Sequence, residues 1–363
     1  MKVVQVINSL MSGGAEKLVV DTTILYVEKG LSVDIILLDG RKTNFFDKLK
    51  EKAPNVNVIS LGSSTKGMYS PAYIFKLRKY IKQYDLVHVH LFPALYWVSL
   101  SASLSGSKTP IIVTEHNSTN RRRASPIFKT LDRLLYKKFK RIVTISGAVH
   151  DNLQDHLGSS FKNLQMIHNG IDLEVFSDAL PYAKKELDVE ETDKVIIQVS
   201  SFSAQKDQPT LIRAMKNLPE DVKLLLVGKG GLRQECEVLV QELGLEDRVQ
   251  FLGVRGDVPR LLKTADVVVL SSHYEGLSLS SVEGMISGRP FVASDVPGLT
   301  EVVEHAGILF PDNDHKALSE EILKLISDTA HYQQTVTSCM ERAKKFDIQI
   351  MTDNYIELYK SLQ

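Results

Sequence analysis

The sequence predicts an α/β protein with two doubly wound domains of the Rossmann type. Short runs of β-branched and apolar residues alternate along the whole chain with longer runs of helical character, as in parallel sheets whose strands are joined by crossover helices. The strand-like runs are more numerous than one such sheet usually holds, and 363 residues suit two domains better than one. We therefore expect two sheets, with ligands bound in a central cleft that the domains face.

The expected strands form two groups, separated by a polar, charge-rich stretch at 177–194. Residues 1–180 are predicted to form the first domain and residues 181–345 the second. The final segment, 346–363, has helical periodicity and can cross back to the first domain. The first group of strands comprises 3–7, 33–38, 86–90, 111–114 and 142–145, and the second comprises 195–199, 224–227, 267–270 and 291–293.

Charge is distributed unevenly along the chain although the net charge is zero. Residues 1–180 contain 24 Lys and Arg against 15 Asp and Glu, whereas residues 181–363 contain 20 against 29. A basic first half beside an acidic second half indicates that the first half faces an anionic partner. Two distant cysteines, Cys236 and Cys339, and the lack of a visible secretory signal or membrane span favour a cytoplasmic location.

The segment 271–283 is the most informative stretch of the sequence, because it places Glu275 and Glu283 on either side of a glycine turn and a helix start. Amides at a helix N-terminus favour an anion such as a diphosphate, and a carboxylate one turn further in, Glu283, can bind ribose hydroxyls. A simpler alternative is that Glu283 forms a capping box with Ser280. The amides of the turn belong to Gly276, Leu277 and Ser278.

Seven short motifs occur in an order and spacing that resemble the family 4 glycosyltransferases. They are residues 12–16, 114–117, 167–172, 205–207, 226–230, 251–253 and 275–283. The resemblance extends over nearly the whole chain. It implies the GT-B architecture, in which two Rossmann-like domains face a cleft, and a retaining transfer from a nucleotide-sugar donor.

Such a transfer develops negative charge on the leaving phosphate. Lys206, just beyond the first strand of the second half, is the expected cation for that phosphate. Gly13 and Gly14 open a turn into a helix, where the backbone can approach a phosphate or sugar, unless they form a simple tight turn. By resemblance, His116 lies near the donor sugar or reaction centre and Glu275 lies beside the transferred sugar.

The sequence departs from the family pattern at two donor-binding positions. The family usually has an arginine four or five residues before the lysine, where this chain has Ser201 and its neighbour Ser200. A hydroxyl can bind a phosphate but lacks the fork and charge of a guanidinium, so Lys229 or Arg255 could substitute. Ser278 stands where a proline is common, and it keeps an available backbone N–H.

Two further features concern metals and membranes. The Asp-Asn-Asp sequence at 312–314 precedes a predicted helix, so we expect a helix cap and neither a metal ion nor another cofactor. The segment 127–141 predicts a basic amphipathic helix, whose apolar side either lies on an anionic membrane or packs in the domain core. The acceptor or membrane side is expected to include the adjacent arginines Arg121, Arg122 and Arg123.

Together these features predict a metal-independent glycosyltransferase with a UDP- or GDP-linked donor and no nucleic-acid partner. The expected acceptor is a hydroxyl of a lipid-linked or polysaccharide precursor of bacterial surface glycans, reached at the inner face of the membrane. Two alternatives remain. One is a nucleotide-sugar epimerase, and the other is a catalytically silent subunit that binds sugar nucleotides. The serine at 201 favours the silent subunit. A dehydrogenase is a weaker alternative, since Gly228 and Gly230 lack the third glycine of a dinucleotide fingerprint.

Overall fold

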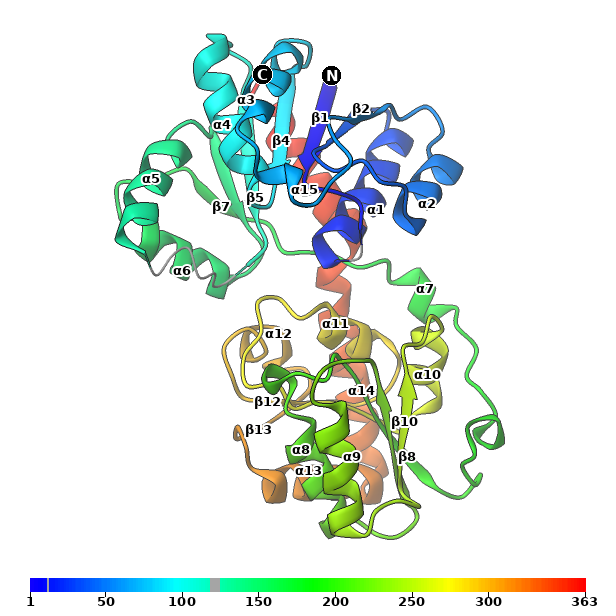
Figure 1. The fold of residues 1–363 in the computed structure, drawn as a ribbon. Helices are drawn as coiled ribbons and strands as arrows, with labels where there is room; N and C mark the ends of the chain where they lie inside the picture. The colour runs from blue at the N-terminus through cyan, green and yellow to red at the C-terminus, as the bar shows by residue number, and fades with distance from the viewer. Residues whose placement is uncertain (12, 118–124) are drawn as a thin grey trace. The chain divides into compact units, whose positions relative to one another are not determined.

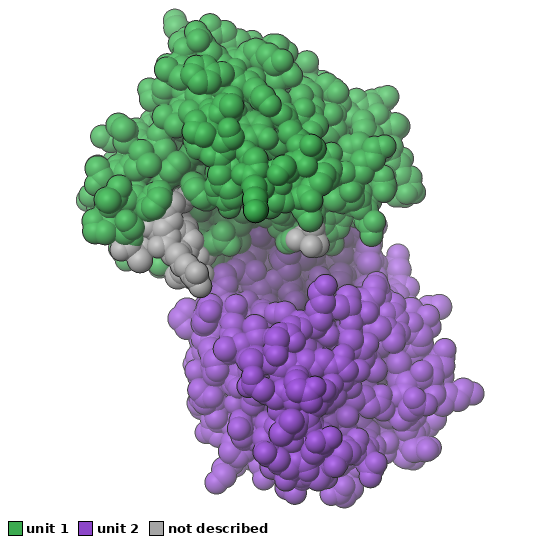
Figure 2. Space-filling view, in the orientation of Figure 1, with its two compact units in different colours: residues 1–168, 349–363 green, residues 169–348 purple. Residues whose placement is uncertain are grey.

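The computed structural model describes residues 1–11, 13–117 and 125–363. The chain forms two compact units, which Figure 2 distinguishes by colour: unit 1 comprises residues 1–168 and 349–363, and unit 2 comprises residues 169–348. Each unit contains its own parallel sheet with helices packed on both faces (Figure 1). The predicted fold class, two Rossmann-like domains, is confirmed.

Unit 1 contains a sheet whose described strands follow the order β3-β2-β1-β4-β5-β6-β7. The order reverses between β1 and β4, and ligands of doubly wound sheets bind outside the carboxyl ends of the strands at such a point. The central strands β1, β4 and β5 are almost entirely buried, as expected when helices cover both faces. Their bounds are β1 (Lys2–Ile7), β2 (Ser32–Leu37), β3 (Val58–Ser60), β4 (Leu86–His90), β5 (Ile111–Glu115), β6 (Arg141–Thr144) and β7 (Leu164–Met166).

The helices of unit 1 bury apolar side chains against opposite faces of this sheet. Helices α1 and α2 pack on one face around Val19, Ile24 and Leu49, and α3 to α6 pack on the other around residues such as Leu77 and Leu153. These elements are α1 (Gly14–Glu28), α2 (Asn44–Lys52), η1 (Gly67–Tyr69), α3 (Ala72–Ile81), α4 (Ala94–Ser105), α5 (Pro126–Tyr136) and α6 (Gly147–Leu157).

The last helix, α15 (Ile348–Lys360), also belongs to unit 1, and its tyrosines Tyr355 and Tyr359 are buried there. The Tyr359 hydroxyl lies 2.7 Å from Nδ1 of His88, and the Tyr355 hydroxyl lies 2.9 Å from Oγ1 of Thr114. Polar groups buried in a sheet must find such partners. The C-terminal helix thus packs on a buried polar layer.

Unit 2 repeats the same strand order, β10-β9-β8-β11-β12-β13, again with every described pair parallel. The strand order of this sheet reverses between β8 and β11. The strands are β8 (Lys194–Val199), β9 (Val222–Val227), β10 (Val249–Gly253), β11 (Val267–Leu270), β12 (Phe291–Ser294) and β13 (Ile308–Phe310). The helices are α7 (Glu174–Ser177), η3 (Lys184–Leu187), η4 (Ala204–Lys206), α8 (Gln208–Ala214), η5 (Met215–Asn217), α9 (Arg233–Leu243), α10 (Val258–Thr264), α11 (Leu279–Ile286), α12 (Thr300–Val303), α13 (His315–Ser327), α14 (Thr329–Ala343) and η6 (Lys344–Phe346).

The division between the units falls at residues 168/169, whereas the sequence places it at 180/181. The polar stretch that resembles a linker is anchored to α10: Lys263 Nζ donates to Ser177 O at 2.5 Å, and Arg260 Nε donates to Leu180 O at 3.1 Å. Upstream, Ile171 forms a parallel bridge with Asp347. These contacts attach residues 169–180 to unit 2.

Helix α5 packs part of its apolar side in the core of unit 1 and leaves the rest exposed. Leu135 is buried and Leu131 packs against the same core, whereas Ile127 and Leu134 are 79% and 64% exposed. The arginines Arg121, Arg122 and Arg123 lie outside the described residues. Within the described chain, helices fall short of the length and apolar character needed to cross a membrane.

We predict that Gly170→Ala destabilises the protein. A Cβ at this position would lie 2.6–2.7 Å from backbone atoms of Asp347 and Ile348, which cannot move without disturbing the bridge to Ile171. Overpacking of this kind costs about 1–3 kcal/mol of unfolding free energy. Thermal or denaturant unfolding measures the loss, with Gly256→Ala as the control because open space surrounds that position. Equal stability of the two variants would contradict the tight packing at Gly170.

Candidate active site

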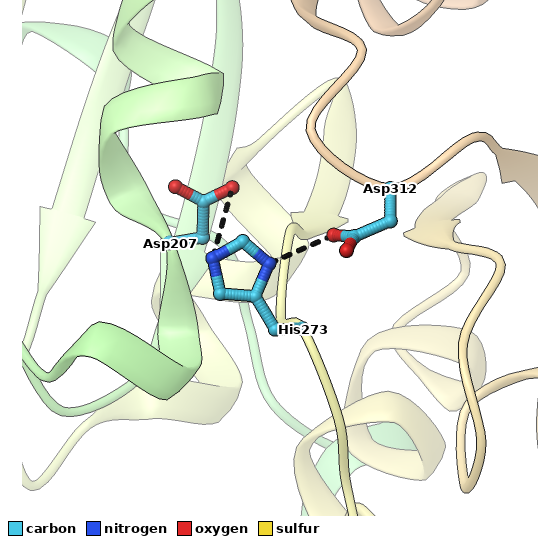
Figure 3. A group of neighbouring side chains, drawn as sticks. All are labelled: Asp207, His273 and Asp312. Carbon is cyan, nitrogen blue, oxygen red and sulfur yellow. Dashed lines mark hydrogen bonds and ion pairs between the residues drawn. The ribbon is translucent and has the colours of Figure 1, made fainter.

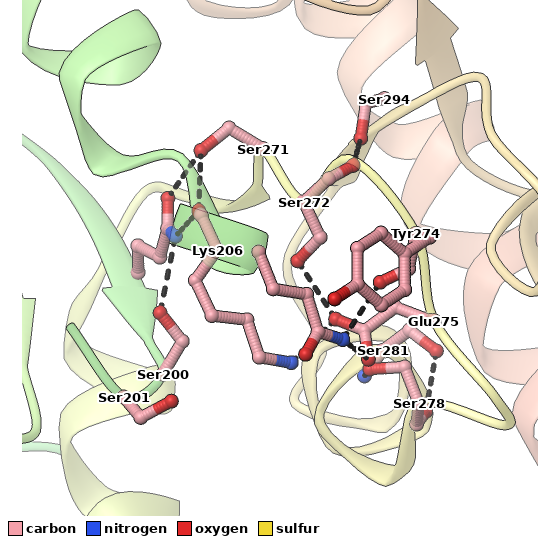
Figure 4. Close-up of polar contacts among 12 residues, drawn as sticks. Ser200, Ser201, Lys206, Ser271, Ser272, Tyr274, Glu275, Ser278, Ser281 and Ser294 are labelled. Carbon is pink, nitrogen blue, oxygen red and sulfur yellow. Dashed lines mark hydrogen bonds and ion pairs between the residues drawn. The ribbon is translucent and has the colours of Figure 1, made fainter. Parts of the chain in front are cut away.

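Lys206 and Glu275 form a buried ion pair at the reversal point of the unit 2 sheet. Lys206 ends η4, which follows β8, and Glu275 lies in the turn between β11 and α11. Since β8 and β11 are neighbours, their following loops meet, and Lys206 Nζ lies 2.5 Å from Glu275 Oε1 (Figure 4). The side chains are only 16% and 7% exposed. Two residues that the sequence predicts as catalytic are thus in direct contact.

Neighbouring polar groups fix the position of the Glu275 carboxylate. Ser272 Oγ donates to Oε1 at 2.7 Å, and Gln205 Nε2 donates to Oε2 at 3.3 Å. The same Gln205 nitrogen donates to the carbonyl of Tyr274 at 2.8 Å. A buried charge pair is costly unless its remaining hydrogen-bonding capacity is satisfied, and these donors help to satisfy it.

The glycine turn leads directly into helix α11. Ser278 caps the helix, since its Oγ accepts a hydrogen bond from Ser281 N at 3.3 Å. The predicted capping box of Ser280 with Glu283 is therefore wrong as the helix cap, because α11 begins at Leu279, two residues before the start that a Ser280 cap requires. Glu283 instead lies within the helix and is half-buried. Behind the turn, Gly298 lies so close to the Glu275 carbonyl that a Cβ would approach to 2.2 Å.

The serines that replace the family arginine lie on the loop after β8. Gln208 Nε2 donates to Ser200 Oγ and to Ser201 O, both at 2.9 Å, whereas the Ser201 residue is exposed. Phe202 N donates to Lys229 O at 3.0 Å, so Lys229 lies on the turn next to Ser201. This turn packs closely on the serine loop, since a Cβ at Gly228 would lie 2.0 Å from Ser200 O.

The two cations that could substitute for the arginine differ in their surroundings. Arg255 Nη2 lies 2.5 Å from Asp257 Oδ2, and hydrogen bonds from Arg255 hold the pKa of that carboxyl well below its usual range. Lys229 is exposed. Lys229 is therefore the more accessible cation beside the serine loop.

His273 lies between the carboxylates of Asp207, which follows Lys206 in the chain, and Asp312 (Figure 3). Its Nδ1 lies 2.8 Å from Asp312 Oδ1, its Nε2 lies 3.8 Å from Asp207 Oδ2, and its backbone N–H donates to Gln205 O at 2.8 Å. Burial raises the pKa of Asp207. Among the described residues, these three side chains are also a group that could hold a metal ion, with ligand atoms within 4.8 Å of one another.

The Asp-Asn-Asp sequence divides its carboxylates between two roles. Asp314 caps α13, because its Oδ1 accepts hydrogen bonds from Lys316 N and Ala317 N, both at 3.0 Å. This agrees with the predicted helix cap. Asp312 instead contacts His273, a partner that the sequence does not indicate.

In unit 1, His116 directly follows β5 at the carboxyl edge of the sheet. Its Nε2 lies 3.1 Å from Nδ1 of His90, and desolvation lowers the pKa of His116 to about 4. The imidazole is therefore neutral at pH 7. Gly13 is the N-cap residue of α1 and Gly14 its first residue, both exposed. Desolvation raises the pKa of Glu16 in the first turn of that helix.

Sequence reasoning missed the residues that hold these groups in place. Nothing in local spacing identifies Gln205, Ser272, His273 or Asp312 as partners of the Lys206 and Glu275 loops. The one available signal is that Gln205 belongs to the motif 205–207 and that Ser272 and His273 lie within the segment 271–283.

Two family models match consecutive parts of the chain. The model described as Glycosyltransferase Family 4 matches residues 12–175, and the model described as Glycosyl transferases group 1 matches residues 182–346. Together they cover both units almost completely.

Individual relatives and solved structures agree with these matches. N-acetyl-alpha-D-glucosaminyl L-malate synthase of Bacillus anthracis is 29% identical over 67% of this chain and 66% of its own length. A diphospho-undecaprenol 4-alpha-N-acetylgalactosaminyltransferase of Campylobacter jejuni is 26% identical over 94% of each chain. The structure of HepE from Anabaena in complex with UDP superposes with a TM-score of 0.86 at 23% identity, covering 99% of this chain and 100% of that one. The protein belongs to the family 4 glycosyltransferases and has the GT-B fold.

Proposed function

We propose that this glycosyltransferase takes its sugar from a nucleoside-diphosphate donor and transfers it to a hydroxyl with retention of configuration and without a metal ion. The observation that carries this proposal is the buried contact between Lys206 and Glu275 beside the Gly276 turn. The Lys206 ammonium, the Glu275 carboxylate and the N-terminus of α11 lie together in unit 2.

The diphosphate is bound by Lys206 and by the backbone N–H groups at the start of α11. The ammonium acts as a point charge, and the amides of residues 276–278 add hydrogen bonds at the positive end of the helix. Glu283 accepts hydrogen bonds from the ribose. The solved complexes of HepE with UDP and with UDP-glucose support UDP as the first nucleotide to test, with GDP second.

Transfer proceeds on one face of the sugar. The bond between the anomeric carbon and the phosphate oxygen breaks as the acceptor oxygen bonds to that carbon from the same side. The acceptor proton passes to the departing phosphate oxygen, so configuration is retained without a covalent enzyme intermediate. Lys206 stabilises the developing phosphate charge, and Glu275 lies beside the sugar as it gains cationic character.

The acceptor is a hydroxyl of a lipid-linked or polysaccharide precursor. Relatives from Campylobacter jejuni and Escherichia coli act, by their names, on diphospho-undecaprenol-linked sugars. In this chain, α5 exposes Ile127 and Leu134 next to basic residues such as Lys129 and Arg133. A basic helix with exposed apolar side chains suits contact with an anionic membrane surface.

We predict that Lys206→Ala weakens nucleotide binding and lowers kcat/KM by about 10²–10³, the usual effect of removing one group that stabilises developing charge. Thermal shifts with UDP, GDP and their sugars, followed by assays of nucleoside-diphosphate release, measure both effects. Lys184→Ala is a matched control, because Lys184 is 17% exposed and pairs with Asp266 at 3.2 Å. EDTA is expected to change neither binding nor turnover.

Three results would contradict this function. The first is equal nucleotide stabilisation of the Lys206 and Lys184 variants, and the second is loss of turnover with EDTA. The third is a glycosyl-enzyme adduct detected by mass spectrometry. Nucleotide binding without product across a broad acceptor panel would instead indicate a catalytically silent binding subunit.

We also predict that Lys229 replaces the missing arginine. Lys229→Ala should weaken nucleoside-diphosphate affinity about 10-fold, since a hydrogen bond to a charged group contributes roughly 1.5–3 kcal/mol. Arg255→Ala should change it less than about 3-fold, because Asp257 already holds that guanidinium. Isothermal titration of the two variants compares them directly. A larger loss in the Arg255 variant would reverse the assignment.

A further inference from the structure

A continuous line of buried polar side chains crosses unit 1 and ends at His116. Gln5 lies on β1, His90 ends β4 and His116 follows β5, and these strands are neighbours in the sheet. His90 Nε2 lies 2.7 Å from Gln5 Oε1, and His90 Nδ1 lies 3.1 Å from His116 Nε2. Gln5 and His90 are 1% and 4% exposed, so their hydrogen bonds must be satisfied within the protein.

Both imidazoles of this line are neutral. Burial lowers the pKa of His90 well below its usual value and that of His116 to about 4. A neutral imidazole has one N–H group and one nitrogen with a lone pair. In a line of hydrogen bonds between two such rings, the proton position on one ring therefore determines the proton position on the other.

Gln5 sets the direction of the line. Its side-chain carbonyl oxygen, Oε1, is the atom that faces His90 Nε2, at 2.7 Å. A carbonyl oxygen only accepts, so His90 donates through Nε2 and keeps the lone pair on Nδ1. His116 must then donate to that lone pair through its own Nε2.

We propose that Gln5 and His90 are positioning residues that fix the proton of His116 on Nε2, so that Nδ1 presents a lone pair at the carboxyl edge of the sheet. His116 thereby recognises a sugar hydroxyl as a hydrogen-bond acceptor. The sugar part of this inference rests on the proposed function, whereas the proton position on His116 does not.

A second branch of the same polar layer offers an internal control. His88 Nε2 lies 2.7 Å from Thr114 Oγ1, and His88 Nδ1 lies 2.7 Å from the Tyr359 hydroxyl. Thr114 is as buried as Gln5 and pairs in register with His90. It nevertheless makes none of the bonds that define the line from Gln5 to His116.

The test is ¹⁵N NMR of the histidine rings in the full-length protein without ligand, at pH 7.5. Wild type should show His116 protonated at Nε2 and unprotonated at Nδ1. Gln5→Leu removes the acceptor for His90 Nε2, and an unsatisfied buried donor costs about 1–3 kcal/mol. Because His90 Nε2 then lacks a partner in either protonation state, His90 no longer fixes the His116 proton on Nε2, and part of the His116 population should carry the proton on Nδ1. Thr114→Val should leave the His116 proton on Nε2.

Turnover supplies a second readout. Because Nδ1 then accepts in only part of the molecules, Gln5→Leu should lower kcat/KM by up to about 10-fold, which is the loss expected for about 1.4 kcal/mol of one hydrogen bond. His90→Phe keeps an aromatic ring in the layer but removes the hydrogen bonds to Gln5 and His116. It should lower kcat/KM by a similar factor. Circular dichroism and thermal unfolding establish that each variant is folded.

A wild-type His116 protonated at Nδ1, or an unchanged proton position in Gln5→Leu, would overturn the proposal. A shift in Thr114→Val equal to that in Gln5→Leu would overturn it as well, since any disturbance of the layer would then suffice. If the NMR results are as expected but no nucleotide sugar is consumed by the wild type, the proton assignment is confirmed and the proposed function fails.

Discussion

The ion pair between Lys206 and Glu275 is the interaction on which the candidate site of unit 2 depends. It removes two charges from water, which is unfavourable unless each charge has a fixed partner. The parallel sheet supplies that fixed geometry, because β8 and β11 are neighbours and release their chains at the same edge. Ser272 and Gln205 then hold the carboxylate, and His273 links the two loops. The protein thus keeps a cation in place before any phosphate arrives.

Much of this arrangement follows from the sequence. Alternating strand and helix patterns predict two parallel sheets, and residues that follow strands in such sheets gather at one edge. Lys206 is predicted beyond a strand for that reason, whereas the positions of Glu275 and His116 near the sugar are implied by the family resemblance. The pairing of Lys206 with Glu275 is a different matter, since it depends on which strands are neighbours and on side-chain reach. Neither is encoded in local spacing.

The missed features share a physical cause, namely that they depend on contacts between distant segments. The stretch 177–194 has linker composition, yet hydrogen bonds from Arg260 and Lys263 hold its beginning on α10 of unit 2. The cap of α11 is Ser278 rather than Ser280, a difference of two residues that composition cannot resolve. The line from Gln5 to His116 spans three strands, so it becomes visible only when their order and register are known.

A double-mutant cycle on nucleotide affinity tests the central claim most directly. Isothermal titration of the preferred nucleoside diphosphate is compared for wild type, Lys206→Met, Glu275→Gln and the double variant. If Glu275 acts by holding Lys206, replacing it changes affinity only when the lysine is present, with a coupling of about 0.5–3 kcal/mol. If Glu275→Gln has the same effect with and without Lys206, the two residues act independently and the account is contradicted.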